Sequence, residues 1–232
     1  MKRLLGGLLV GLFILGSVTY GLAADITAAY VSRYIWRGQD LNAGQPAMQP
    51  ALTVYLGDQG LSANIWGSYN LGTVGKQEIT EVDYSLTLAR KINDNWSYSL
   101  YYTLYNYPPV TGSGNKDGEF FLTLTGDGLL FKPTLLYSYN NVLGNASYVN
   151  LAGRQSFNLF NLPIDGSLSF GYDGGQAGVQ PGFSDANLVF SSAIQADKAT
   201  ITPQLCYTVV GKDTRPTADN VLYFCVNVAG SL

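Results

Sequence analysis

The side chains of this sequence that could do chemistry are carboxylates and two cysteines, because the chain contains no histidine. Glu81 and Asp83 have the residue types of a glycosidase acid/base pair, and they lie two positions apart. Without histidine, the Ser-His and Cys-His arrangements of nucleophilic enzymes cannot form. Two carboxylates on one strand face usually meet water or a basic partner, not a substrate. The sequence therefore predicts a protein that is not an enzyme and has no catalytic residues.

The sequence also lacks the motifs that hold cofactors and metals. It has neither a phosphate-binding loop nor a dinucleotide-binding fingerprint. Two cysteines combined with carboxylates would make poor zinc ligands. The segment Tyr-Asp-Gly-Gly at 172–175 has oxygen ligands that calcium accepts, but such Asp/Gly-rich segments are more often plain turns. We therefore expect no cofactor and no metal site.

Cys206 and Cys225 are the only cysteines, and both fall on the polar faces of neighbouring predicted strands. Pairing them opposite each other also pairs Leu205 with Val226, so apolar and polar residues match across the hairpin. Directly opposed residues of antiparallel strands can lie about 4.5 Å apart between Cα atoms, which suits a disulfide. We therefore predict a structural disulfide in an exported protein, with two free thiols shielded inside the protein as the alternative.

The elements that must position these residues are strands, because apolar and polar side chains alternate with period two along the chain. About twelve such segments follow one another. The first spans 26–37 and places Arg33 and Arg37 on its polar face. Twelve is an even number, as bacterial outer-membrane barrels require. The sequence predicts an all-β fold, a transmembrane antiparallel up-and-down β-barrel of about 12 strands.

A soluble, lipocalin-like barrel shows the same alternation with its apolar face inside. The high strand number, the aromatic residues at strand ends and a strand that runs to the last residue favour the membrane barrel instead.

The connections between the predicted strands alternate in length, as periplasmic turns and extracellular loops do. The segment 158–165 is the exception, a longer link where a short turn is expected. Short turns are predicted at 57–60, 93–95, 126–128 and 196–198, and longer loops at about 38–47, 70–78, 107–118, 173–185 and 210–220.

Charged residues within the strands carry the functional signal. An Arg or Lys that faces lipid at the bilayer midplane costs about 2–4 kcal/mol, so we expect these charges to face the lumen. They form either an internal salt-bridge network that fills the barrel or rings that select a charged solute. We take the network as the default, with a narrow aqueous path beside it and weak selectivity from the mixed signs. The predicted lumen-lining charges are Arg33, Arg37, Glu81, Asp83, Glu119, Lys132 and Arg154.

Composition agrees with a membrane barrel. Charged residues make up 12% of the chain, about half of what a soluble domain carries, while aromatics reach 13%. No apolar run of about 18 residues follows the N-terminus, which excludes transmembrane helices. The chain after the N-terminal segment has 11 basic against 16 acidic residues. That balance argues against a nucleic-acid partner, which would need a basic surface.

Residues 1–23 have the organisation of a signal peptide. Met1-Lys2-Arg3 is a basic start, Leu4 to Leu15 is apolar, and Gly21-Leu22-Ala23 supplies small residues before a cleavage site. We expect export through the Sec pathway, with residues 24–232 forming the barrel.

Four segments of the sequence resemble the TorF porin family. They are YVSRYIWRGQDLNAGQPAMQPAL (30–52), ANIWGSYNL (63–71), TEVDYSLTLAR (80–90) and YYTLYNYP (101–108). The most specific element is Trp36-Arg37-Gly38, followed by Gln45-Pro46-Ala47. The resemblance implies an outer-membrane β-barrel, leaves the substrate open and offers no catalytic residue.

Together these observations predict a porin or porin-like channel for passive diffusion of small solutes in a Gram-negative outer membrane. The alternative is a closed structural or interaction barrel that presents extracellular loops and transports nothing. The expected partners are outer-membrane lipids and lipopolysaccharide, with periplasmic chaperones and the barrel-assembly machinery during biogenesis. Both a monomer and a homo-oligomer remain open.

Overall fold

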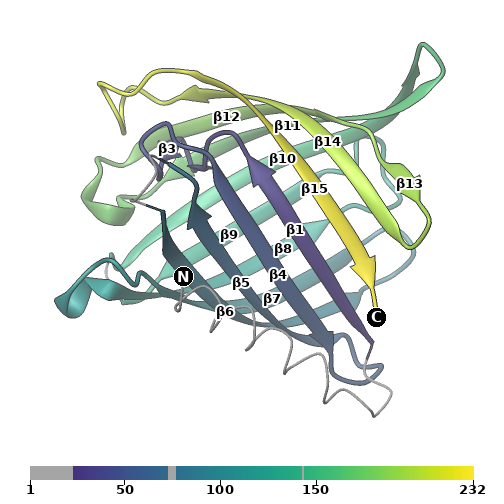
Figure 1. The fold of residues 1–232 in the computed structure, drawn as a ribbon, viewed down its shortest axis with the longest axis horizontal. Coiled ribbons are helices and arrows are strands. Elements are labelled where there is room, and N and C mark those ends of the chain that lie inside the picture. Colours follow the sequence, from purple (N-terminus) through teal and green to yellow (C-terminus); the bar gives the residue numbers. More distant parts are fainter. Residues whose placement is uncertain (1–22, 73–76, 143) are drawn as a thin grey trace.

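The computed structural model describes residues 23–72, 77–142 and 144–232. In these residues twelve antiparallel strands form one closed barrel (Figure 1). The predicted signal peptide, residues 1–23, lies outside the described residues except for its last position. The barrel strands are β1 (Ala24–Val31), β4 (Ala47–Tyr55), β5 (Leu61–Asn70), β6 (Glu78–Lys91), β7 (Ser97–Asn106), β8 (Lys116–Thr125), β9 (Thr134–Asn140), β10 (Ala146–Leu159), β11 (Leu162–Asp173), β12 (Gly182–Ser191), β14 (Ala199–Val210) and β15 (Val221–Ser231).

Closure of the barrel joins the first strand to the last. β1 lies between β4 and β15, with Asp25 opposite Ser231 and Val31 opposite Cys225. β12 pairs with β14 along seven residue pairs, so the short strand β13 (Ile194–Ala196) does not interrupt the ring. Since every barrel strand has two neighbours, no long unpaired edge is left to pair with another chain.

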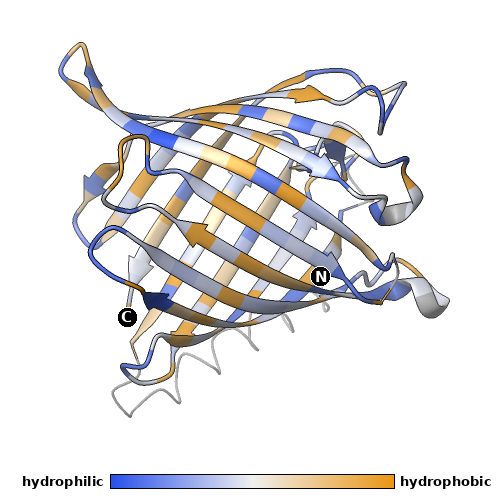
Figure 2. Cartoon of the chain, turned by 180° about the vertical axis from the view of Figure 1, so that it is seen from behind, coloured by the Kyte–Doolittle hydropathy of each residue, from blue (hydrophilic) through white to orange (hydrophobic). Residues whose placement is uncertain are grey.

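The outer face of the barrel is apolar and its inner face is polar. On β6, Tyr84 and Leu86 point outward and are 51% and 53% exposed, whereas Glu81 on the inner face is only 5% exposed. Figure 2 shows the resulting alternation of hydrophobic and hydrophilic residues along the strands. A soluble barrel would have the opposite arrangement. The predicted transmembrane up-and-down barrel of about 12 strands is therefore confirmed.

The connections lie at the two ends of the barrel, and most of the longer ones are at one of them. This end, at the left in Figure 1, we call the loop end. The other, the turn end, also has the C-terminus, and the predicted alternation of length is not strict, because its connection 126–133 is longer than the loop-end connection 141–145. Among the described residues, no helix is long and apolar enough to cross a bilayer. The loop-end connections are 32–46, 71–77, 107–115, 141–145, 174–181 and 211–220, and the turn-end connections are 56–60, 92–96, 126–133, 160–161 and 192–198.

Three local predictions about the strands were wrong. Segment 158–165 is not a long link, because β10 and β11 pair down to Leu159 and Leu162 and leave a two-residue turn. Lys132 was predicted within a strand, but β9 begins at Thr134, so Lys132 belongs to the connection 126–133. Phe131 and Lys132 have positive φ angles, 61° and 36°, which end any extended strand there.

The third wrong prediction concerns the first strand. β1 ends at Val31, and the chain then folds into a small hairpin of β2 (Ile35–Trp36) and β3 (Gln39–Asp40). The two central residues of its turn, Arg37 and Gly38, have φ angles of 47° and 74°. Positive φ at both positions is what a type I′ turn requires. Arg33 and Arg37 are therefore not on one strand face.

The register of the last hairpin also differs from the predicted one. Cys206 lies opposite Tyr223, and Cys225 lies opposite Gln204, so the cysteines are offset by two positions. A two-residue shift leaves every side chain on its own face. For that reason, matching apolar with apolar residues could not distinguish the two registers. Both cysteines are free thiols in the structure.

Candidate functional site

The connection 32–46 folds from the loop end into the barrel and brings Arg37 among residues of the opposite wall. Its hairpin turn needs glycine at position 38, because a Cβ there would lie 3.0 Å from the backbone oxygen of Ser184. The hydroxyl of Ser184 donates a hydrogen bond to the Arg37 backbone oxygen at 3.0 Å. Contacts with β12 thus hold the turn in place.

The Arg37 guanidinium is buried and paired. It contacts Glu119 at 2.8 Å, and the two side chains are 6% and 3% exposed. It also donates to the Ser138 hydroxyl at 3.1 Å and to the side-chain oxygen of Gln176. The other Glu119 oxygen accepts a hydrogen bond from the Tyr105 hydroxyl at 2.9 Å. Five strands or connections therefore converge on one ion pair.

Aromatic rings surround the same guanidinium. Its central carbon lies 4.2 Å from the ring centroid of Tyr148, 4.6 Å from that of Trp36 and 5.8 Å from that of Phe121. Arginine over an aromatic face gains about 0.5–2 kcal/mol, more where water is excluded. Arg37 is held by charge, hydrogen bonds and rings at once.

A second arginine extends this arrangement toward the connection 211–220. Arg215 lies 3.6 Å from Asp173 and donates to the Ser184 hydroxyl at 3.0 Å. Burial lowers the pKa of Arg215, while the Asp173 carboxylate acts in the opposite direction. We call the connected residues the Arg37 network: Arg37, Glu119, Ser138, Asp173, Gln176, Ser184 and Arg215.

Beside the Arg37 network lies a cavity of about 510 Å³ at the loop end, which we call the vestibule. Its lining is mostly aromatic and acidic. Burial raises the pKa of Tyr107, and the Glu81 carboxylate acts in the same direction. The vestibule is lined by Tyr34, Trp36, Arg37, Gln39, Leu41, Trp66, Glu81, Asp83, Tyr105, Tyr107, Asp117, Glu119, Asn140, Gly144 and Gln176.

The predicted lumen charges lie in three places. Arg37, Glu81, Asp83 and Glu119 line the vestibule. Arg33 is 45% exposed and contacts Asp40 of its own connection at 3.4 Å.

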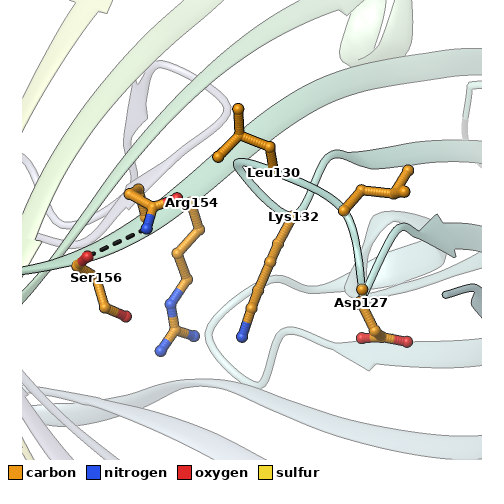
Figure 3. Close-up of a pocket in the computed structure, with 8 residues that line it drawn as sticks. Asp127, Leu130, Lys132, Arg154 and Ser156 are labelled. Carbon is orange, nitrogen blue, oxygen red and sulfur yellow. Dashed lines mark hydrogen bonds between the residues drawn. The ribbon is translucent and has the colours of Figure 1, made fainter. Parts of the chain in front are cut away.

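The third place is at the turn end. Lys132 and Arg154 line a separate pocket of about 410 Å³, where their side chains extend in the same direction (Figure 3). Arg154 contacts Asp165 at 2.6 Å, and both side chains are substantially exposed. This pocket opens at the surface and contributes nothing to the vestibule.

The two cysteines lie away from the vestibule lining and are free thiols. The Cys225 thiol donates to the Gln204 side-chain oxygen at 2.8 Å. Among the described residues, no group of three or more potential metal ligands comes together.

Several vestibule and network residues were not singled out from the sequence. Tyr105 continues the polar-face alternation of Thr103, so its inward direction could have been found from the pattern. Gln176 and Arg215 lie in long connections, where no periodic signal says which side chains turn inward. Trp66 lies on the same face of β5 as Asn64 and Ser68, and a large aromatic residue does not fit the polar pattern of that face.

Comparison with known proteins identifies the fold and not a family. No protein-family model matches the chain, and no curated protein matches it. Among solved structures, the chain is similar to the COG4313 outer membrane channel from Pseudomonas putida F1, with a TM-score of 0.54 and 9% identity over 93% of this chain and 97% of that one. It is similar to the NanC porin, with a TM-score of 0.50 and 12% identity over 89% and 97%. It is also similar to LpxR from Salmonella typhimurium, with a TM-score of 0.51 and 9% identity over 90% and 99%. The chain therefore has the fold of outer-membrane β-barrels.

Proposed function

We propose that this protein is a porin-like channel of a Gram-negative outer membrane, through which small solutes diffuse passively. The observation that carries the proposal is the polar inner face of a closed twelve-strand barrel with a wide vestibule at its loop end. Eight-stranded barrels are filled by side chains, and barrels of 16–18 strands leave a water-filled channel, so about twelve strands leave room for a narrow path. The similar outer membrane channel and porin support the same reading.

Membrane location and orientation belong to this proposal. The apolar outer face would contact outer-membrane lipid and lipopolysaccharide, and the turn end would face the periplasm. The N-terminal segment would direct Sec export, after which chaperones and the assembly machinery would insert the barrel. The resemblance of residues 30–108 to TorF porins supports the same location.

A closed barrel is the second candidate, and the Arg37 network favours it. The network crosses the lumen from the connection 32–46 to β8, β9 and the connection 174–181. If it fills the cross-section, the protein would be a structural barrel that presents its loops. The two candidates differ in whether water passes beside Arg37.

Liposome swelling separates the channel from the closed barrel. Folded protein in liposomes should admit small neutral sugars, with rates that fall as the sugars become larger. Folding is checked independently, because membrane barrels migrate differently on gels before and after heating. Folded protein that swells liposomes no faster than lipid alone would reject the channel and leave the closed barrel.

A further inference from the structure

We propose that the vestibule is a binding site for small organic cations, such as quaternary or primary ammonium compounds. This inference rests on the proposed function, since it names the solute class that the channel would select. The sequence predicted weak selectivity from the mixed signs of the lumen charges. We expect a preference for cations instead, because Glu119 already neutralises the positive charge of Arg37.

The first observation is the balance of charge around the cavity. Arg37 is the only basic residue that lines the vestibule in the described part of the chain, and it is paired with Glu119 at 2.8 Å. Glu81 and Asp83 have no ion-pair partner among the described residues. Four carboxylates of the described chain line the vestibule against this one basic residue, and Glu81 and Asp83 are two of those that Arg37 does not pair with.

The second observation is that Glu81 is buried and fixed by a tyrosine, while Asp83 has a buried oxygen without a partner. Glu81 is 5% exposed and accepts a hydrogen bond from the Tyr34 hydroxyl at 3.0 Å. One oxygen of Asp83 is buried and has no hydrogen-bond partner. Buried polar atoms are normally hydrogen-bonded, and an unpaired one calls for an explanation. An organic cation that carries an N–H or O–H group, as a primary amine or choline does, would supply the missing donor, and its charge would balance that of the carboxylate.

The third observation is the set of aromatic residues beside these carboxylates, with Trp66 and Tyr105 directly opposite Asp83 on the two neighbouring strands. The rings of Tyr34 and Trp66 lie 5.8 Å apart, and those of Tyr105 and Tyr107 lie 6.4 Å apart and nearly parallel. Aromatic faces attract ammonium groups by about 0.5–2 kcal/mol each, and cages of such rings recognise quaternary ammonium ligands. An inorganic cation would prefer oxygen ligands alone, so the rings favour an organic one.

Charge and burial together favour a cation as the ligand. Burial disfavours the charged form of a carboxylate, and an opposite charge nearby favours it. A bound cation would therefore stabilise the ionised forms of Glu81 and Asp83, whereas a neutral solute would not and an anion would be repelled by them. Selection therefore depends on charge and on the aromatic surface together.

The experiment compares choline with its neutral analogue of the same shape, 3,3-dimethylbutan-1-ol. Binding to the purified, folded protein in detergent is measured by titration calorimetry and by the fluorescence of the vestibule tryptophans. Saturable binding of choline is expected, at least tenfold tighter than binding of the neutral analogue. Equal binding of the two ligands, or no binding of choline, would overturn the proposal.

Variants locate the binding site. E81Q with D83N should weaken choline binding at least tenfold. E78Q, at an exposed position of the same strand that does not line the vestibule, should leave it unchanged. Unchanged choline binding in the folded double variant would overturn the proposal, and the ligand comparison on the native protein decides the matter if that variant does not fold.

Binding in detergent requires no transport, so a failure of the proposed channel can be told apart from a failure of the proposed cation site. Choline binding without liposome swelling would reject the channel and keep the cation site. Liposome swelling without choline binding would reject the cation site and keep the channel.

Discussion

Arg37 combines a costly backbone conformation with an unusual number of contacts. Its φ angle of 47° belongs to the left-handed region, which costs a non-glycine residue on the order of 1–3 kcal/mol. The ion pair with Glu119 and the three surrounding rings offset that cost. Such strain persists only where the surrounding contacts hold the residue in place. Here these contacts hold the connection 32–46 inside the barrel.

Removing the charge of Arg37 should therefore destabilise the protein. Arg37→Met leaves Glu119 buried without its partner, and breaking a buried pair costs about 3–5 kcal/mol. The free energy of unfolding, measured by denaturant titration of the barrel in lipid vesicles, should fall by that amount. Adding Glu119→Gln should restore part of it, since no unpaired charge then remains.

Arg33→Met provides the matched control. Arg33 pairs with Asp40 at the exposed surface of the same connection, and an exposed pair contributes about 0–1 kcal/mol. If both arginine substitutions lower the free energy of unfolding equally, the Arg37 network is not what holds the connection.

At the residue scale, the sequence predicted which charges face inward better than it predicted their partners. The strand residues Glu81, Asp83 and Glu119 lie at the vestibule because period-two alternation sets their direction. Arg37 lies there for a different reason, because its connection folds inward. That fold depends on contacts with β12, which is about 150 positions later in the chain, and no local pattern contains them.

At the scale of elements, the alternation of side chains is the feature on which the barrel depends. It can be tested on β6, where Leu86 points outward and is 53% exposed. Leu86→Arg should lower the free energy of unfolding in lipid vesicles by about 2–4 kcal/mol, because a charge would face hydrocarbon. Leu86→Phe should have little effect. Equal stability of the Arg and Phe variants would contradict the assignment of the outer face.

The elements also show where sequence patterns lose information. Twelve strands were predicted because alternation and turn residues repeat along the chain. The register of β14 with β15 was wrong by two positions, since a shift of two preserves both faces. The end of β1 was wrong because Tyr34 and Trp36 continue an alternation that the turn at Arg37 and Gly38 overrides.

At the scale of the whole molecule, the barrel and its inserted connection have opposing effects on the open space in the lumen. Twelve strands would enclose more space than side chains fill, and the connection 32–46 occupies part of that space at the loop end. The vestibule is what remains beside it. The acidic vestibule would then raise the local concentration of cations on the way through the barrel.

Single-channel recording in planar bilayers tests the central claim, that a continuous water path runs through the barrel beside the Arg37 network. The native protein should give discrete conductance steps, and the reversal potential under a salt gradient should show a preference for cations. Arg37→Ser, which releases the connection 32–46, should give larger steps. Folded protein that inserts into the bilayer and gives no steps, in both the native and the Arg37→Ser forms, would contradict the account.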